Sequence, residues 1–240
     1  MKNSIPFLLT FIFGALFSLL LLNNDGLLVQ IWVNFAGDIE YLIRRHIFLV
    51  VTSGTLAILV AVPMGVWLSR PFMRKYAESA MQGLNVGTTV PTLAVLALSM
   101  SFLGIGVVPA IFALWIATLL PIVRNTYVGI REVPQFLLEA ATGMGMTPFQ
   151  ILFRIELPNA LYVIFAGIRT AMVINVGTVP LAFLIGAGGL GELIFTGIAL
   201  DNIEMMLAGA IPVALLAMLV DFIILQIQTW SISRGVNPLR

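Results

Sequence analysis

The amino-acid sequence predicts an all-α integral membrane protein with about six transmembrane helices. Hydrophobic residues make up 60% of the 240 residues and charged residues 10%, whereas a soluble domain averages about 45–50% apolar and about 25% charged residues. The apolar residues also gather in six long stretches, most of them close to the roughly 17–25 residues that one helix needs to cross hydrocarbon. So little charge cannot cover a water-facing surface, and we therefore expect the chain to lie in a bilayer.

The six apolar stretches are separated by polar or charged segments. They are Ile5–Leu22, Ile47–Leu68, Val86–Leu103, Val107–Val123, Ala160 to about Leu190, and Met205–Leu225. Asn23-Asn-Asp-Gly26 rather than a small-x-small cleavage site follows the first stretch, so we expect an uncleaved span instead of a signal peptide. The fifth stretch is too long and too rich in glycine for one straight helix. We expect a helix followed by an irregular segment, Gly186–Gly191, that is covered by protein or lines a cavity.

The distribution of charge predicts the orientation. Six spans put both termini on one side, and if that side is the cytoplasm the inner segments hold nine of the twelve cations: Lys2, Arg70, Arg74, Lys75, Arg124, Arg131, Arg154, Arg234 and Arg240. The outer loops are then acidic, as the positive-inside rule requires. Arg44-Arg45-His46 goes against this pattern, and we expect it at the outer headgroup layer at the foot of the second span. The chain thus divides into a first span with its outer loop (1–45), a membrane core (46–226) and a cytoplasmic tail (227–240).

The longest inner segment, residues 124–158, begins with the signals of a short helix. Pro134 suits the first turn of a helix that runs to about Thr142, because its missing N–H would be unpaired there anyway. Gly143 and Gly145 can adopt the left-handed conformation that ends such a helix.

A second short helix is predicted immediately afterwards. Thr147 is a good N-cap, Pro148 takes the first helical position, and an amphipathic pattern follows before Leu157-Pro158 closes the helix. Such a pair of helices suits either an interfacial hairpin that rests on lipid headgroups or a docking element for a cytoplasmic partner, and local mechanics do not separate the two.

The residues of this segment carry a resemblance. Glu139-Ala-Ala is followed after three residues by Gly145, and after nine more by Ile155-Glu-Leu-Pro158. This resembles, position for position, the EAA-x3-G-x9-I-x-L-P loop of ATP-binding-cassette (ABC) importer permeases. The resemblance implies a type I ABC importer transmembrane fold with a cytoplasmic coupling helix that inserts into a groove on the ATPase subunit. By resemblance the docking residues are Glu139, Ala140, Ala141, Gly145, Ile155, Leu157 and Pro158.

Further stretches resemble the permease subunits of osmoprotectant importers, which carry glycine betaine, choline and carnitine. They are Val90–Leu98, Gly104–Ala110, Leu120–Gly129, Ala166–Ala171 and Ile185–Gly191. Two positions depart from the pattern: Ala117 stands where a tyrosine is common, and Pro180 replaces a small residue. Because related importers share the same loop, methionine or another small amino acid is the alternative cargo.

The sequence also excludes several kinds of chemistry. It has no G-x-x-x-x-G-K-[ST] run, so ATP and its Mg²⁺ are expected on a separate ATPase subunit and this chain is not expected to be an enzyme. Four Trp and four Tyr are scattered along the chain, which places selectivity in an external substrate-binding protein. No cysteine and a single histidine provide neither a metal site nor a catalytic triad, and a net charge of +1 argues against nucleic acid. A second permease copy or paralogue and the lipid bilayer complete the expected partners.

Polar residues inside the spans need separate reasons. We expect Arg169 to be a structural charge that bonds carbonyls or a carboxylate between helices, and Asp221 to lie far from it, near the inner surface. Asn175 and Thr178 share one side of a helix and are candidates for the substrate pathway, although hydrogen bonding between helices is the more common use of such residues. An intramembrane enzyme would need paired groups at one depth. A structural membrane protein without partners would leave the docking loop unexplained.

Overall fold

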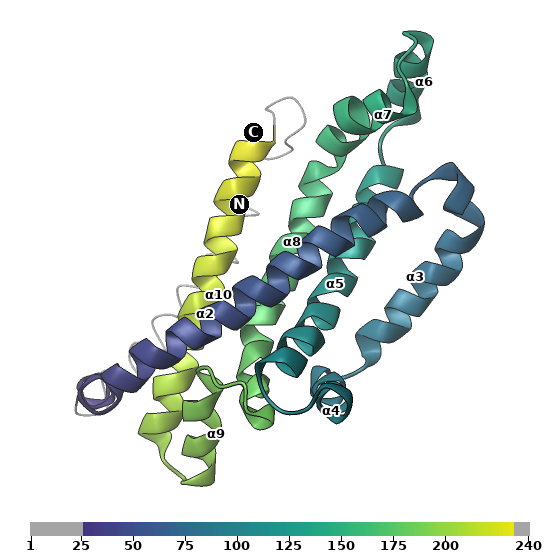
Figure 1. Cartoon of the computed structure of the whole chain (residues 1–240). Coiled ribbons are helices and arrows are strands. Elements are labelled where there is room, and N and C mark those ends of the chain that lie inside the picture. The colour runs from purple at the N-terminus through teal and green to yellow at the C-terminus, as the bar shows by residue number, and fades with distance from the viewer. Residues whose placement is uncertain (1–25, 233–240) are drawn as a thin grey trace, which may run out of the picture.

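The computed structural model describes residues 26–232, which form helices joined by short turns (Figure 1). The helices are α2 Leu27–Leu68, α3 Arg74–Thr89, α4 Thr92–Leu103, α5 Val107–Arg131, α6 Gln135–Gly143, α7 Pro148–Ile151, α8 Leu157–Thr178, α9 Gly191–Ala199 and α10 Ile203–Ser231. Two 3-10 segments, Pro71–Met73 and Val179–Ile185, and a π-helical turn, Leu152–Glu156, connect them. The predicted all-α class is confirmed.

The described residues contain four helical segments long and apolar enough to cross a membrane, or five if the bent pair α3–α4 counts as one span. The predicted span Val86–Leu103 is wrong as a straight helix, because the chain turns by 93° between the two members of that pair. Val90-Pro91 causes this break, since the residue before a proline is driven out of the α conformation and Val90 is extended. The predicted first span, Ile5–Leu22, lies outside the described residues.

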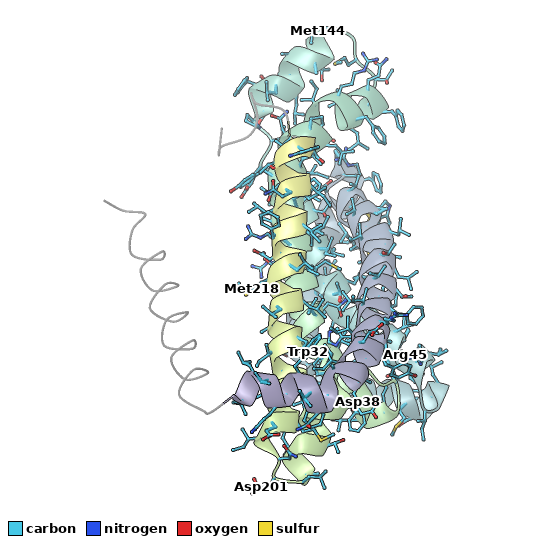
Figure 2. All side chains as sticks on the ribbon, turned by 90° about the vertical axis from the view of Figure 1, so that its left-hand side faces the viewer. Trp32, Asp38, Arg45, Met144, Asp201 and Met218 are labelled. Carbon is cyan, nitrogen blue, oxygen red and sulfur yellow. The ribbon has the colours of Figure 1, made fainter. Side chains whose placement is uncertain are left out.

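Helix α2 corrects the prediction of an outer loop before residue 46. It is continuous from Leu27 and would be about 63 Å long if straight, twice the thickness of the hydrocarbon. Figure 2 shows its first half, with Trp32 and Asp38, running across the lower end of the upright helices, and the chain turning upward near Arg45. The charges that suggested a loop lie on the exposed side of this half, where Arg44 and Glu40 form an ion pair of 2.6 Å.

Close packing of α2, α5 and α8 forms the centre of the bundle, and α10 packs against α8. Small residues permit this approach: a Cβ on Gly65 of α2 would lie 2.5 Å from Cβ of Thr126, and one on Gly129 of α5 would lie 3.0 Å from Cβ of Val163. Helices inside lipid gain little from apolar burial alone, so such backbone contact supplies much of their attraction.

The two ends of the bundle differ. Helices α6 and α7 project at one end, to which α10 also rises, whereas α4 and α9 lie at the other (Figure 1). We call these the docking-loop end and the opposite end. Helix α10 continues to Ser231, six residues past the predicted end at Leu225.

Candidate functional site

The docking loop is built by a defined helix ending. Gly145 has φ +76°, and the N–H groups of Gly145 and Met146 donate to the carbonyls of Thr142 (2.9 Å) and Ala141 (3.1 Å). These two bonds form a Schellman motif, which stops α6 and reverses the chain. Gly145 therefore occupies the left-handed position, as predicted, whereas Gly143 remains helical as the last residue of α6.

The start of α7 also follows the prediction. Thr147 is the N-cap, and Pro148 occupies the first helical position. The N–H of Gln150 donates to Oγ1 of Thr147 (3.3 Å), and the N–H of Thr147 donates to Oε1 of Gln150 (2.9 Å). This reciprocal capping box fixes the direction in which the second helix leaves the turn.

The predicted helix end at Leu157-Pro158 is wrong. The N–H of Leu157 donates to the carbonyl of Leu152, five residues back, and the chain passes through a π turn into α8 without a break. Pro158 is the second residue of α8 and directly follows the π turn, so the helix continues past a residue without a backbone N–H. The docking loop and the membrane helix therefore form one continuous helical segment, Pro148–Ile185.

The motif residues lie in two parts of the docking loop, its projecting end and its root next to α8. Glu139, Ala140 and Gly145 are exposed, and Ala141 is buried against the loop itself. Gln135 donates to Glu139 across one helical turn at 2.8 Å. At the root of the element the side chains are half-buried, namely those of Ile155, Leu157 and Pro158.

Exposed apolar side chains on α6, α7, the turn between them and the π turn after α7 were not assigned to docking from the sequence. They are Phe136, Met144, Phe149 and Phe153, each more than half exposed, and we call them the docking surface. The rings of Phe149 and Phe153 contact each other at 4.5 Å between centroids. A groove of about 680 Å³ lies where α5 ends and α6 begins, and its lining includes Arg131 and Glu139. Large apolar side chains that project from a protein end mark an interaction site.

An ion pair connects the root of the docking loop to α2. The guanidinium of Arg70, two residues past the end of α2, lies 2.8 Å from the carboxylate of Glu156 in the π turn. Both side chains are largely buried, at 21% and 12% exposed. Arg70 also donates to the carbonyl of Val66 at 3.1 Å, so the same side chain contacts both the last turn of α2 and the π turn.

Arg169 has the carboxylate partner that was expected, and that partner is Asp221. The guanidinium donates through Nε to Oδ1 and through Nη2 to Oδ2, the latter at 2.6 Å, which joins α8 to α10. The prediction that these two residues lie far apart is wrong. Asp221 is ten residues before the end of α10, because that helix extends to Ser231.

Asn175 and Thr178 face the protein rather than a described cavity. Asn175 is 1% exposed and donates to Oγ of Ser53 on α2 at 2.8 Å. Thr178 donates to the carbonyl of Asn175 at 3.0 Å within its own helix. A role for these two residues in the pathway stays a prediction.

His46 is completely buried, which corrects its predicted place in the headgroup layer. Its Nε2 donates to the carbonyl of Val176 on α8 at 3.1 Å. That carbonyl needs an outside donor because the residue four positions on, Pro180, has no N–H. The neighbouring Arg45 donates to the carbonyl of Ala187 at 3.0 Å. Helix α2 therefore bonds to both ends of residues 176–187, the segment that connects α8 to the glycine-rich turn.

Replacing His46 with leucine should therefore lower the free energy of unfolding by about 1–3 kcal/mol, because the Val176 carbonyl becomes a buried acceptor without a donor. Restoring a backbone N–H with Pro180→Ala should recover part of this loss in the double variant. Thermal unfolding in detergent measures both effects. If His46→Leu lowers the free energy of unfolding equally with and without Pro180→Ala, the unpaired Val176 carbonyl is not the cause of the loss.

No group of three or more Asp, Glu or His side chains within residues 26–232 is placed to hold a metal ion. The site consists instead of a projecting protein surface and of polar pairs between helices.

Comparison with known proteins gives matches over most of the chain. A family model described as "Binding-protein-dependent transport system inner membrane component" matches residues 61–234. The chain is 55% identical over 184 residues, 77% of its length and 78% of the relative's, to the osmoprotectant import permease protein OsmY of Salmonella typhimurium LT2. It is 42% identical to the carnitine transport permease protein OpuCB of Listeria monocytogenes, covering 91% of this chain and 94% of that one. It is 44% identical to the choline transport system permease protein OpuBB of Bacillus subtilis 168, covering 89% and 97%.

The fold is similar to that of solved structures. A chain of the MetNI methionine ABC transporter in an inward-facing conformation superimposes with a TM-score of 0.73, at 23% identity, covering 81% of this chain and 96% of that one. An amino acid ABC transporter gives a TM-score of 0.65 at 16% identity, covering 82% and 95%. At these identities the likeness concerns the fold alone.

Proposed function

Since the chain belongs to the family of binding-protein-dependent transport system inner membrane components, we propose that it is the permease subunit of an ABC importer for quaternary-amine osmoprotectants. As a multi-pass membrane subunit it would form half of a translocation unit with a second permease copy or a paralogue. The relatives named for osmoprotectants, carnitine and choline cover most of the chain at 42–55% identity, which supports this substrate class. A methionine or other amino acid cargo is not favoured, because those likenesses lie at 16–23% identity and concern the fold.

The docking loop is the observation that carries the proposal. A Schellman motif and a capping box hold four large exposed apolar side chains at the projecting end of the molecule, which is typical of an interaction site. A partner with a complementary apolar groove would bury them, and in an importer of this family that partner is the ATPase. ATP and Mg²⁺ would then bind on the ATPase. The docking loop of this chain would receive the movement that ATP produces in the ATPase, which we call the stroke.

The continuous helical segment suggests how the stroke would reach the membrane. A push on the docking surface is transmitted along the backbone from α7 through the π turn into α8, and sideways through Arg70 and Glu156 into α2. Because α8 is joined to α10 through Arg169 and Asp221, these helices would move together. We place the docking-loop end and both termini in the cytoplasm of a bacterial cell, and the opposite end toward an external substrate-binding protein.

Uptake measurements test the substrate class. Labelled glycine betaine, choline and carnitine are offered to cells that lack their other importers, with and without this chain and its neighbouring subunits, at low and high osmolarity. We expect uptake of at least one of the three that requires ATP and disappears when the chain is deleted. Absence of uptake of all three, with the ATPase still co-purifying, would keep the permease and discard the substrate class.

Truncating Phe149 to alanine should weaken binding of the ATPase by about tenfold or more, as expected for an aromatic anchor at the centre of an interface. The fold should be unaffected, because the side chain is 70% exposed. Co-purification of the ATPase and ATP-driven uptake measure the effect. The matched control is Phe102→Ala, an 86% exposed phenylalanine of α4 at the opposite end, which should leave ATPase binding unchanged. Equal effects of the two substitutions would contradict an anchoring role.

A further inference from the structure

Two of the clefts formed by residues 26–232 differ in their chemistry. One, of about 370 Å³, lies between α2 and α10 and is lined only by apolar side chains, among them Trp32, Ile211 and Leu215. The other, of about 390 Å³, lies between α8 and α10 and contains the Arg169–Asp221 pair. Lipid tails can cover the first cleft without cost, but not the second.

The second cleft carries charged side chains well inside α8 and α10. Arg169 is twelve residues after Leu157 and nine before Thr178, which places it roughly 14–18 Å from the two ends of α8. The side chains of Arg169 and Asp221 are 36% and 34% exposed. A charge that faces lipid at this depth costs about 2.5–3.5 kcal/mol, and such residues therefore face protein or a water-filled cavity.

The rest of the lining is mixed, and polar groups stand among four apolar side chains, Ala166, Val173, Ile174 and Leu225. Tyr162, Thr170 and Gln228 bring hydroxyl and amide groups to the same cleft. Thr170 is exposed and no described hydrogen bond ends on its hydroxyl; Gln228 donates to the carbonyl of Tyr162 at 3.3 Å. The volume lies within the roughly 300–1,000 Å³ of small-molecule sites.

We propose that the α8–α10 face carrying the Arg169–Asp221 pair borders the water-filled translocation pathway of the assembled importer. The inference rests on the proposed function for the identity of the solute, which is a small cation or zwitterion bearing a quaternary ammonium. Fixed positive and negative charges held against each other give this wall no net charge. A solute with an ammonium group can approach the Asp221 carboxylate and the Tyr162 ring, and a solute carboxylate can approach Arg169.

The chain contains no cysteine, so single cysteines introduced into it report their own surroundings. Thr170→Cys tests the polar cleft and Leu215→Cys tests the apolar one; both positions are exposed. The importer, assembled with its ATPases in lipid nanodiscs, is treated with the methanethiosulfonate that carries a trimethylammonium group, with and without ATP. Only a hydrated thiol ionises and reacts, so we expect Thr170→Cys to react about tenfold or more faster than Leu215→Cys.

The outcomes separate the pathway from its substrate. A second variant, Ile174→Cys, lies one turn along α8 in the same cleft. The inference would be overturned if neither this variant nor Thr170→Cys reacts, with or without ATP, because lipid or the second permease then seals this face. Equal reaction of Leu215→Cys would also overturn it, because access would not be confined to the polar face. Reaction of Thr170→Cys in an importer that takes up no quaternary amine would leave the pathway standing and remove the proposed substrate.

Discussion

Replacing Gly145 with valine is expected to abolish ATPase binding and transport while leaving the membrane bundle folded. Gly145 has φ +76°, and a Cβ there would meet no atom within 4 Å, so the obstacle is the backbone conformation rather than space. The left-handed conformation costs an ordinary residue about 1–2 kcal/mol, and more for a β-branched side chain. The Schellman motif would then open, and α6 and α7 would no longer present the docking surface at one angle. Co-purification of the ATPase and ATP-driven uptake are the measurements.

The matched control is Gly145→Asn, because asparagine adopts the left-handed conformation more readily than other side-chain-bearing residues. This variant should retain most ATPase binding. If asparagine and valine abolish binding equally, the ATPase requires a bare glycine at the contact. If neither affects binding, the turn is not needed for docking.

The second large effect is expected from breaking the ion pair between α8 and α10. Asp221→Leu leaves Arg169 charged and unpaired inside the apolar helix α8, which costs about 2.5–3.5 kcal/mol where lipid covers it, on the order of a hundredfold in the ratio of folded to unfolded protein. The yield of folded chain and its thermal unfolding measure this loss. It should be largest when the chain is expressed without its partners, because lipid then covers this face.

Replacing both members of the pair provides the control. Arg169→Leu with Asp221→Leu leaves no unpaired charge, and leucine carries no cost where lipid covers this face. The double variant should therefore recover most of the stability lost by Asp221→Leu. A double variant no more stable than Asp221→Leu would show that packing of these side chains, rather than their charge, joins the helices.

Signals that act within a few residues of each other predicted the fold well. The alternation of long apolar stretches with charged segments predicted the membrane class, and α5 and α10 lie where apolar stretches were recognised. The turn at Gly145 and the cap at Thr147 were predictable because left-handed glycine and N-cap threonine are local chemistry.

The errors arose where a distant part of the chain decides the outcome. Charges before residue 46 suggested a loop, but one side of that segment packs against α10 and makes it helical. Leu157-Pro158 suggested a helix end, but a π turn carries the helix past the proline. Arg169 and Asp221 are 52 residues apart, and their pairing depends on how α8 and α10 pack. His46, which donates to the Val176 carbonyl, is 130 residues away in the sequence, so this bond likewise depends on how two helices pack.

The π turn at Leu152–Glu156 has a consequence for the angular register of the docking loop. A π turn closes its hydrogen bond over one residue more than an α turn, so residues before it are rotated by about 100° around the axis compared with an uninterrupted α-helix. The direction in which Phe149 points relative to α8 is therefore determined by the number of residues in between as much as by their chemistry. Removing Leu152 from this turn would keep every docking side chain and every span. The docking surface would nevertheless point in a different direction around the axis of α8. The nine-residue spacing between Gly145 and Ile155 thus determines the direction in which the docking surface points around the axis of α8.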